Sequence, residues 1–355
     1  MITAQGLTRS FRTRSGPVPA VNGIDLQVDP GSVVAFLGPN GAGKTTTVRM
    51  LATLLTPTGG HATVGGYDVV RERDKVRRII GYVGQASSVA DHRVEDELLT
   101  QARLQGMSRA AGKVRAAEMI ERFELGTVRA RTLTKLSGGQ RRRFDLALGL
   151  VNDPRVLFLD EPSVGLDPQS RANLWEHLRA LRAAQGTTVF LTTHNLDEAD
   201  LLSDRIIVID GGRVIASDTA EALKSQVGGD VVTLETDQLS ATATVLASVV
   251  PGSDLDTAPG VVQFHIAQAQ RRLPELLRAL DQAGIELASV SVKRPTLDDV
   301  FLRLTGRSLR EDALPAAAPQ PAEGTTAAAD PADSAAQPEP TTAAPAQPEP
   351  AEVNS

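Results

Sequence analysis

The sequence predicts an α/β fold built on a parallel β-sheet, and three apolar segments carry that prediction. Residues 33–37, 156–159 and 189–191 are runs of apolar residues with no alternating polar positions. Such runs are typical of strands that are buried on both faces of a sheet. Because ligands collect at the carboxyl ends of parallel strands, we expect one edge of this sheet to carry the functional residues.

The first 31 residues have a different pattern. Apolar and polar residues alternate, with breaks at Gly16-Pro17 and Pro30-Gly31. This alternation is typical of half-exposed strands, so we expect an antiparallel β-layer before the first buried strand.

A glycine-rich loop follows the first buried strand. It reads Gly38-Pro39-Asn40-Gly41-Ala42-Gly43-Lys44-Thr45, and a helix is expected from Thr46 to Leu55. The loop matches the phosphate-binding pattern G-x-x-x-x-G-K-[ST] in the required strand, loop and helix order. Backbone amides would surround the phosphates, Lys44 would reach the outer ones, and the Thr45 hydroxyl would face Mg²⁺. We therefore predict a site for ATP or GTP.

Residues 60–85 are predicted to form a second β segment, interrupted by a charged helix over 71–78 and ending at Gly84-Gln85. Judged alone, Gln85 fits an ordinary loop residue as well as a site residue. From residue 91 to about 150 the apolar residues follow helical spacing, which predicts an inserted helical subdomain.

Within that subdomain lies Leu136-Ser137-Gly138-Gly139-Gln140. Ser137 is a suitable cap for a helix that continues to Leu150, and the glycines would let a ligand approach bare backbone amides. An anion-binding helix start and an ordinary capped helix are equally consistent with these five residues alone.

Two carboxylates follow the second buried strand, and a histidine follows the third. Asp160 is placed to hold Mg²⁺, and Glu161 to polarise an attacking water. Asp167 is expected to cap a helix over 169–184, and His194 is expected to face the γ-phosphate. The alternatives are exposed acids at a strand end and a structural histidine.

Composition sets outer limits. The chain has 355 residues, enough for two domains, and no cysteine, which excludes disulfides. The net charge is −6 and no basic surface is indicated, so we expect no nucleic-acid partner. We find no signal peptide and no apolar run long enough to span a membrane, so any membrane association should come through a partner.

Beyond residue 220 the composition changes. Strands are expected at 231–236, 261–266 and 285–292 with helices at 239–250 and 271–283, a small α/β accessory domain over 221–310. It would be ferredoxin-like if 254–258 adds a strand. A last helix from Leu297, capped by Thr296 with Asp299 at capping-box distance, would pack on the core or contact a partner. Residues 311–355 are rich in Ala, Pro, Glu and Thr, and a disordered tail is expected.

Taken in order, these motifs resemble the nucleotide-binding domain of ATP-binding cassette (ABC) proteins over residues 1–220. The resemblance implies a RecA-like core, an antiparallel β subdomain and the helical subdomain over about 91–150. It makes Gln85 the Q-loop residue, with a catalytic role and a place at Mg²⁺, and 136–140 the signature. It also makes Asp167 the D-loop residue and His194 the switch histidine. Phe11 takes the place of an adenine-stacking aromatic.

Family geometry also implies a homodimer in which each ATP lies between the phosphate loop of one subunit and the signature of the other. Ser137 with the Gly138 and Gly139 amides would then enclose the γ-phosphate. Glu161 would act on water and His194 would hold the phosphate. The remaining signature residues, Leu136 and Gln140, belong to the same nucleotide-binding set.

The final helix, with Leu297-Asp298-Asp299-Val300-Phe301-Leu302 and Leu304-Thr305-Gly306, looks like the ending of daunorubicin/doxorubicin-resistance-type exporter ATPases. That group pairs a cassette with a separate integral membrane permease, which places the chain at the cytoplasmic face of the cell membrane. Three alternatives remain: an exporter ATPase for glycan or lipid, an importer ATPase, and a soluble ABC ATPase of DNA repair or translation.

Overall fold

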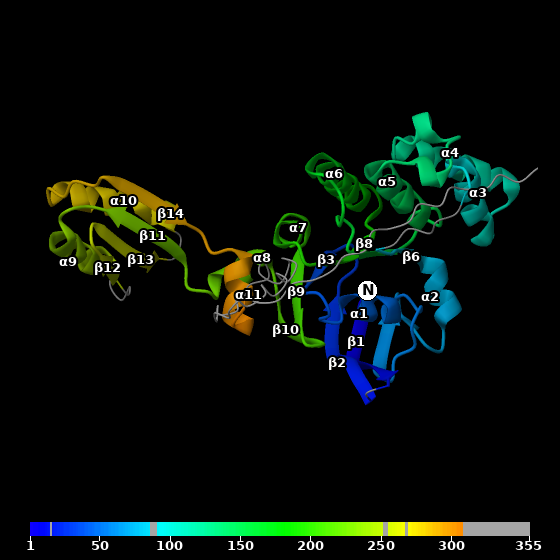
Figure 1. Ribbon diagram of the computed structural model, residues 1–355, viewed down its shortest axis with the longest axis horizontal. Helices are drawn as coiled ribbons and strands as arrows, with labels where there is room; N and C mark the ends of the chain where they lie inside the picture. The colour runs from blue at the N-terminus through cyan, green and yellow to red at the C-terminus, as the bar shows by residue number, and fades with distance from the viewer. Residues whose placement is uncertain (15, 86–90, 251–254, 267–268, 308–355) are drawn as a thin grey trace, which may run out of the picture. The chain divides into compact units, whose positions relative to one another are not determined.

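The computed structural model describes residues 1–14, 16–85, 91–250, 255–266 and 269–307 (Figure 1). In this part of the chain no helix is both long and apolar enough to cross a bilayer. The predicted tail over 311–355 lies outside the described residues.

A six-stranded sheet in the order β10-β9-β3-β8-β7-β6 forms the centre of the N-terminal part. Its strands are parallel except for β10. They are β3 (Val33–Leu37), β6 (Ile80–Val83), β7 (Val156–Asp160), β8 (Thr188–Thr193), β9 (Arg205–Asp210) and β10 (Arg213–Asp218).

Alternate residues of the central strands enter two different hydrophobic clusters, because both faces of the sheet are covered. In β3, for example, Ala35 belongs to one cluster and Phe36 to the other. Figure 1 shows α5, α6 and α7 on one face and α1 with the antiparallel strands on the other. The predicted buried strands are therefore confirmed, and β3, β8 and β7 end side by side at one edge.

A second sheet has the order β2-β1-β4-β5, and its strands pair antiparallel. It confirms the expected β-layer and comprises β1 (Ile2–Thr13), β2 (Gly16–Val28), β4 (Gly59–Val64) and β5 (Tyr67–Asp68). The single β segment predicted over 60–85 was wrong in one respect. Its first half, β4, joins this sheet, whereas β6 joins the six-stranded sheet, where three of its four residues are buried.

Helices connect and cover these sheets. The phosphate-loop helix α1 ends at Leu51, earlier than predicted, and Thr53 just beyond it has a left-handed φ of 63°. Helix α1 spans Lys44–Leu51. The other α-helices of this part are α2 (Arg73–Ile79), α3 (Val94–Leu104), α4 (Arg109–Arg122), α5 (Gly138–Gly149), α6 (Pro168–Gln185), α7 (Leu196–Leu202) and α8 (Ala220–Ser225).

The C-terminal part contains a four-stranded antiparallel sheet in the order β12-β13-β11-β14. Its chain order is β11 (Asp230–Glu235), α9 (Leu239–Val249), β12 (Leu255–Ala258), β13 (Val261–Ile266), α10 (Ala269–Gln282) and β14 (Ser289–Lys293). The strand at 255–258 is present, so this is the ferredoxin-like β-α-β-β-α-β arrangement, with a hydrophobic cluster of its own.

The last helix, α11 (Leu297–Thr305), has the predicted capping box between Thr296 and Asp299. Its buried residues Leu297, Val300 and Phe301 belong to the cluster that covers the six-stranded sheet, not to the cluster of the accessory domain. The helix is therefore held by packing on the core. The domain boundaries at 220 and 310 remain predictions.

Candidate functional site

The phosphate loop joins the end of β3 to α1, and close packing requires two of its glycines, Gly38 and Gly43. A Cβ on Gly43 would lie 2.4 Å from the Ala20 carbonyl oxygen, and the residue has a left-handed φ of 101°. Lys44 is only 5% exposed. Its Nζ donates to the carbonyl oxygens of Gly38, at 2.7 Å, and Pro39, at 3.0 Å. The ammonium group is thus fixed inside the loop that surrounds it.

Asp160, at the end of β7, is completely buried. Its Oδ1 accepts hydrogen bonds from the hydroxyls of Thr45 and Thr192, each at 2.8 Å. Its Oδ2 has no hydrogen-bond partner among the described residues. A buried carboxylate oxygen without a partner is costly, and hard divalent cations prefer oxygen ligands. The group is therefore suited to a magnesium ion.

Glu161 leaves the strand in an unusual backbone conformation, with a left-handed φ of 49°. Its N–H donates to the Thr192 hydroxyl at 2.9 Å, which helps to hold this conformation. Non-glycine residues in this region cost about 1–3 kcal/mol and concentrate at functional sites. The turn directs the carboxylate to Lys44 and His194 instead of along the strand.

The Glu161 carboxylate contacts two basic groups. Oε1 lies 3.0 Å from Lys44 Nζ, and Oε2 lies 2.8 Å from His194 Nδ1. Burial opposes ionisation, but the hydrogen bond with His194 and the Lys44 charge outweigh it and hold the pKa of Glu161 below its ordinary value. The same hydrogen bond raises the pKa of His194. At neutral pH this favours an ionised Glu161 that is oriented by its neighbours.

A cavity of about 390 Å³ opens over this group of residues. It is lined by Ala20 and by nine of the predicted site residues, which are Pro39, Asn40, Gly41, Gly43, Lys44, Thr45, Thr46, Gln85 and Glu161. Asp160 and His194 contact lining residues directly. The structure thus brings the predicted phosphate, cation and water-activating residues to one edge of the sheet.

The signature residues lie outside this cavity. Ser137 and Gly138 are exposed, and Leu136 packs against the core. The Ser137 hydroxyl accepts from the Gln140 amide at 3.3 Å, and the Gln140 side chain accepts from the Ser137 amide at 3.1 Å, a complete capping box. The start of α5 is well formed, but none of the described residues 136–140 lines the cavity of its own chain.

The predicted D-loop residue lies beside the signature. Asp167 caps α6 by accepting from the Ser170 amide at 3.1 Å and from its hydroxyl at 2.6 Å. A Cβ on Gly139 would lie 2.5 Å from that hydroxyl oxygen. The glycine therefore allows α5 and α6 to approach closely. Hydrogen bonds from Ser170 lower the pKa of Asp167.

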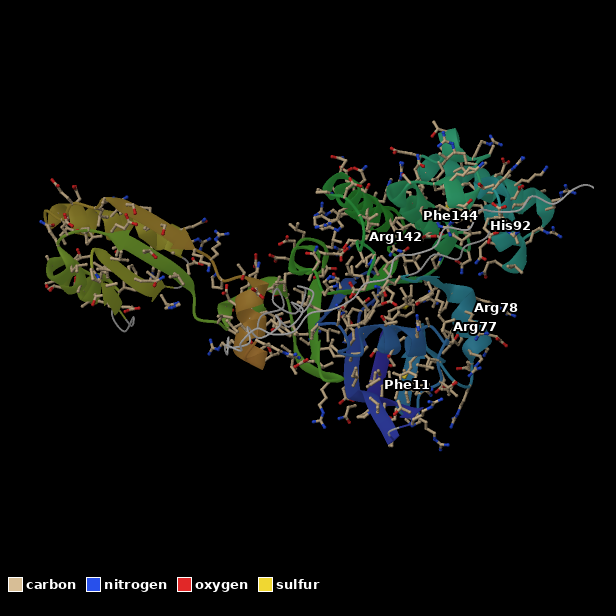
Figure 2. All side chains as sticks on the ribbon, viewed as in Figure 1. Phe11, Arg77, Arg78, His92, Arg142 and Phe144 are labelled. Atoms are coloured by element: carbon tan, nitrogen blue, oxygen red, sulfur yellow. The ribbon has the colours of Figure 1, made fainter. Side chains whose placement is uncertain are left out.

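The lining of the cavity also lacks three further predicted residues, which are Phe11, Gly38 and Ala42. Phe11, labelled in Figure 2, lies on β1, is 38% exposed, and has the Arg9 guanidinium 4.9 Å from its ring centre. Ala42, inside the loop, is buried. An exposed aromatic ring is available for stacking on a base, and its role remains a prediction.

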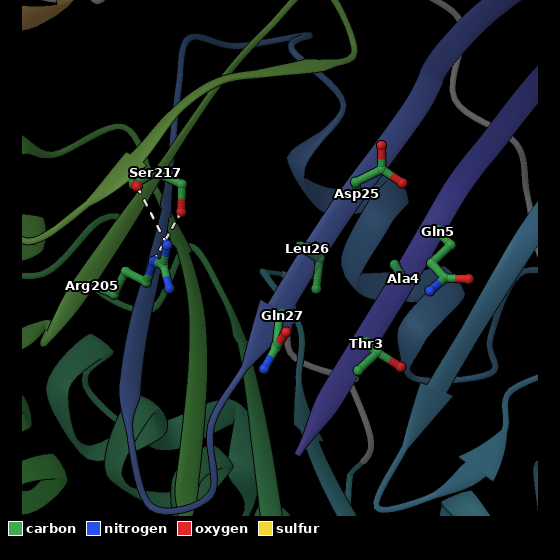
Figure 3. Close-up of a pocket in the computed structure, with 8 residues that line it drawn as sticks. All are labelled: Thr3, Ala4, Gln5, Asp25, Leu26, Gln27, Arg205 and Ser217. Atoms are coloured by element: carbon green, nitrogen blue, oxygen red, sulfur yellow. Dashed lines mark hydrogen bonds between the residues drawn. The ribbon is translucent and has the colours of Figure 1, made fainter.

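A larger hollow of about 610 Å³, shown in Figure 3, lies away from this edge, between β1, β2, β9 and β10. Its two charged residues are used internally. Asp25 accepts from the Gly6 amide at 2.7 Å, and Arg205 donates to the Ser217 hydroxyl at 3.0 Å. This hollow offers no group of residues suited to phosphate chemistry.

Sequence reasoning missed buried residues that make hydrogen bonds next to the site. Thr192 bridges Asp160 and Glu161, and its sequence does not distinguish it from Thr188 and Thr193 of the same strand. Glu198 on α7 is fully buried and accepts from the Ser163 hydroxyl at 3.0 Å, and burial raises its pKa. Nothing in the pattern of α7 distinguishes that glutamate from its acidic neighbours.

Residues 21–164 match the family model of the ABC transporter, and residues 219–305 match that of the ATP-binding protein DrrA1-3-like, C-terminal domain.

The chain is 46% identical over 315 residues to the daunorubicin resistance ATP-binding protein DrrA3 of Streptomyces coeruleorubidus, which covers 87% of this chain and 97% of that protein. It is 50% identical over 295 residues to the daunorubicin/doxorubicin resistance ATP-binding protein DrrA of Streptomyces peucetius, with 81% and 88% covered. The Nod factor export ATP-binding protein I of Cupriavidus pinatubonensis is 39% identical, with 85% and 91% covered.

Among solved structures, the fold is similar to the dimeric ATP-binding cassette MJ0796 in a post-hydrolysis state bound to ADP and Pi. The TM-score is 0.58 at 25% identity, and the match covers 62% of this chain and 98% of that one.

Proposed function

This chain belongs to the family of ABC transporter ATP-binding proteins and is an ATPase, and from that premise we propose that it powers efflux of a drug or antibiotic through a separate integral membrane permease. The observation that carries the chemistry is the contact of Glu161 with both Lys44 and His194 beneath the phosphate loop. The high identity to two daunorubicin-resistance proteins supports the choice of cargo class.

In the proposed reaction, ATP lies in the cavity with its phosphates against the loop amides and Lys44. A bound phosphate would compete with Glu161 for the Lys44 ammonium group, and this would free the carboxylate to orient the attacking water. Its lowered pKa makes Glu161 a weak base, so orientation contributes as much as proton removal. His194 would stabilise the negative charge that develops on the γ-phosphate.

For the metal we propose a magnesium ion held by Asp160, Thr45 and Gln85. The buried, unpartnered Oδ2 of Asp160 supports this, as does the position of Gln85 on the same cavity. Mg²⁺, when bound, neutralises part of the phosphate charge during transfer. The Thr45 hydroxyl now donates to Asp160, so it would exchange that partner for the metal.

For the assembly we propose a homodimer at the cytoplasmic face of the cell membrane, with no nucleic-acid partner. Each signature would complete the site of the other subunit. The exposed, fully capped start of α5 supports this arrangement, because its residues do not line the cavity of their own chain. A helix N-terminus offers free amides and a favourable dipole to phosphate.

The relative named for Nod factor export favours a second candidate, an exporter ATPase for a glycan or lipid cargo. The chemistry at the phosphate loop would be the same. Only transport can separate the two candidates, since the ATPase residues do not contact cargo.

The test is a pull-down in mild detergent from cells that make the full-length chain, followed by identification of the copurifying membrane protein. Membrane vesicles with that permease should accumulate labelled daunorubicin in the presence of ATP, and vesicles with the Glu161→Gln variant should not. Accumulation of a glycolipid but not daunorubicin would support the second candidate. Copurification with ribosomes or DNA, without a permease, would contradict both.

A further inference from the structure

Arg142, in the second turn of α5, is a buried cation whose purpose the proposed reaction does not explain. Its exposed fraction is 7%. It is labelled in Figure 2 beside α5. Its Nη1 donates to the carbonyl oxygen of Gly84 at 3.0 Å, and its Nε and Nη2 have no hydrogen-bond partner within the described residues.

Stability alone does not account for a guanidinium in this position. Burial lowers the pKa of Arg142, although nearby acidic groups, chiefly Asp145, Glu198 and Asp160, oppose that effect. Replacing a buried charge by an apolar side chain of similar volume is often neutral or stabilising. The side chain is therefore better explained by what it holds in place.

The group that it holds is the peptide unit before Gln85. β6 ends at Val83, so Gly84 and Gln85 are no longer fixed by strand pairing. The Gly84 carbonyl and the Gln85 amide belong to one planar peptide unit. A charge-assisted hydrogen bond to that carbonyl therefore restricts the direction in which the chain enters Gln85.

The helix that carries Arg142 is itself fixed along β6. At its far end, a Cβ on Gly81 would lie 2.1 Å from the Gly149 carbonyl oxygen, so helix and strand are in direct contact. Asn152, just beyond α5, donates to the Ile80 carbonyl oxygen at 2.9 Å. From α4, Arg115 donates to the carbonyl oxygens of Leu150 and Val151 at 2.7 and 2.9 Å. At the other end of α5, near the signature, Arg142 makes the corresponding hydrogen bond, to the Gly84 carbonyl oxygen.

From these contacts we propose that Arg142 is a positioning residue that couples Gln85 to the signature helix of the same chain. Gln85 lines the nucleotide cavity of its own chain, and Ser137 begins the helix that would face the nucleotide of the partner. Arg142 thus joins the two half-sites that one chain contributes to two different ATP molecules. The inference rests on the proposed role of Gln85 and on the shared sites.

The test is a double-mutant cycle on the full-length chain with Arg142→Met, Gln85→Ala and the double variant. Each single variant should lower the kcat of ATP hydrolysis by about tenfold while KM changes by less than about threefold. The double variant should be no more than about twofold worse than the slower single variant, because both remove one function. The dependence of rate on ATP should also lose its cooperativity.

Arg143→Gln is the matched control. Arg143 is the next residue of α5, carries the same charge, and pairs with Glu124 on the surface at 2.7 Å. That variant should keep wild-type kcat and cooperativity. If Arg142→Met folds poorly, Arg142→Leu replaces it in the same cycle, since Leu likewise cannot donate to the Gly84 carbonyl oxygen.

The outcomes are distinguishable. If Gln85→Ala alone has wild-type kcat, the proposed role of Gln85 fails and the inference falls with it. If Gln85→Ala is slow but Arg142→Met is as fast as wild type, or if the two effects multiply fully in the double variant, the inference alone is overturned. A merely structural role would lower thermal stability without this non-additive loss of kcat.

Discussion

The chain buries its charges against one another at the phosphate loop, whereas at the start of α5 it leaves its polar groups at the surface. The side chains of Lys44 and Glu161 are each 6% exposed, and they form an ion pair at 3.0 Å. Ser137 and Gly138 are exposed, and within the described part of the chain the Ser137 hydroxyl bonds only to its own cap. The first region is preorganised within one chain, whereas in the proposed dimer the second is a preformed surface that would bind the nucleotide of the other subunit.

Because of this difference, mutations in the two regions should have different effects. A change at the phosphate loop alters a charge network that exists in the isolated chain. A change at the signature should leave that network intact and act only when two chains meet.

Glu161→Gln should lower the kcat of ATP hydrolysis by at least about a hundredfold, because the amide cannot accept a proton from water. ATP binding should persist, since the loop and Lys44 remain. In the presence of ATP and Mg²⁺ the variant should accumulate as a dimer, detectable by light scattering. Steady-state hydrolysis at the wild-type rate would remove Glu161 from its proposed role.

Ser137→Arg should also lower kcat, by about a hundredfold, because the new side chain blocks the surface that would meet the partner's phosphate. Nucleotide binding to the monomer should be unchanged, which equilibrium titration at low protein concentration would check. Ser108→Arg is the matched control, because the Ser108 hydroxyl also caps a helix, α4, and Ser108 is also exposed. Weakened binding to the Ser137→Arg monomer would contradict the proposed separation of the two regions.

The smallest effect concerns pH. Because the pKa of His194 is raised, its stabilising pairing with Glu161 should be fully present below its ordinary pKa of about 6.5. It should be lost as pH rises through the raised value. Because the pKa of Glu161 is lowered, the carboxylate stays ionised in moderately acidic solution. The contribution of the pair to stability therefore falls only when pH drops below the ordinary pKa of a glutamate.

The thermal stability lost in His194→Ala should therefore be largest near pH 6 and should shrink at higher pH. The side chain of His194 is 34% exposed, so solvent screening keeps the effect below about 1 kcal/mol. The Lys44 charge also faces Glu161, and it is present in both the wild-type chain and the His194→Ala variant. In a Glu161→Gln background the pH dependence should disappear, and its persistence there would show that another group is responsible.

Sequence patterns predicted the core of this fold well because both faces of the central strands are covered, and this produces long apolar runs. They also predicted the capping of α5 and α11, since a cap depends on residues three positions apart. They did not separate β4 from β6, because which sheet a short strand joins is decided by contacts between distant segments.

For the site, the ends of three buried strands could be predicted to bring Gly38, Asp160 and His194 to one edge, and the structure places each of them in contact with a residue that lines the cavity. The left-handed turn at Glu161 could not be predicted, because glutamate rarely adopts it. Arg142 is the middle one of three consecutive arginines in α5. Only its hydrogen bond to the carbonyl oxygen of Gly84, 58 residues away, distinguishes it from the other two.

The central claim is that each active site takes its phosphate loop from one chain and its signature from another. Mixing two inactive variants, Lys44→Ala and Ser137→Arg, tests it most directly. A mixed dimer would combine the intact loop of the Ser137→Arg chain with the intact signature of the Lys44→Ala chain. We predict that ATP hydrolysis reappears on mixing, whereas a mixture as inactive as its components, despite measured mixed dimers, would contradict the account.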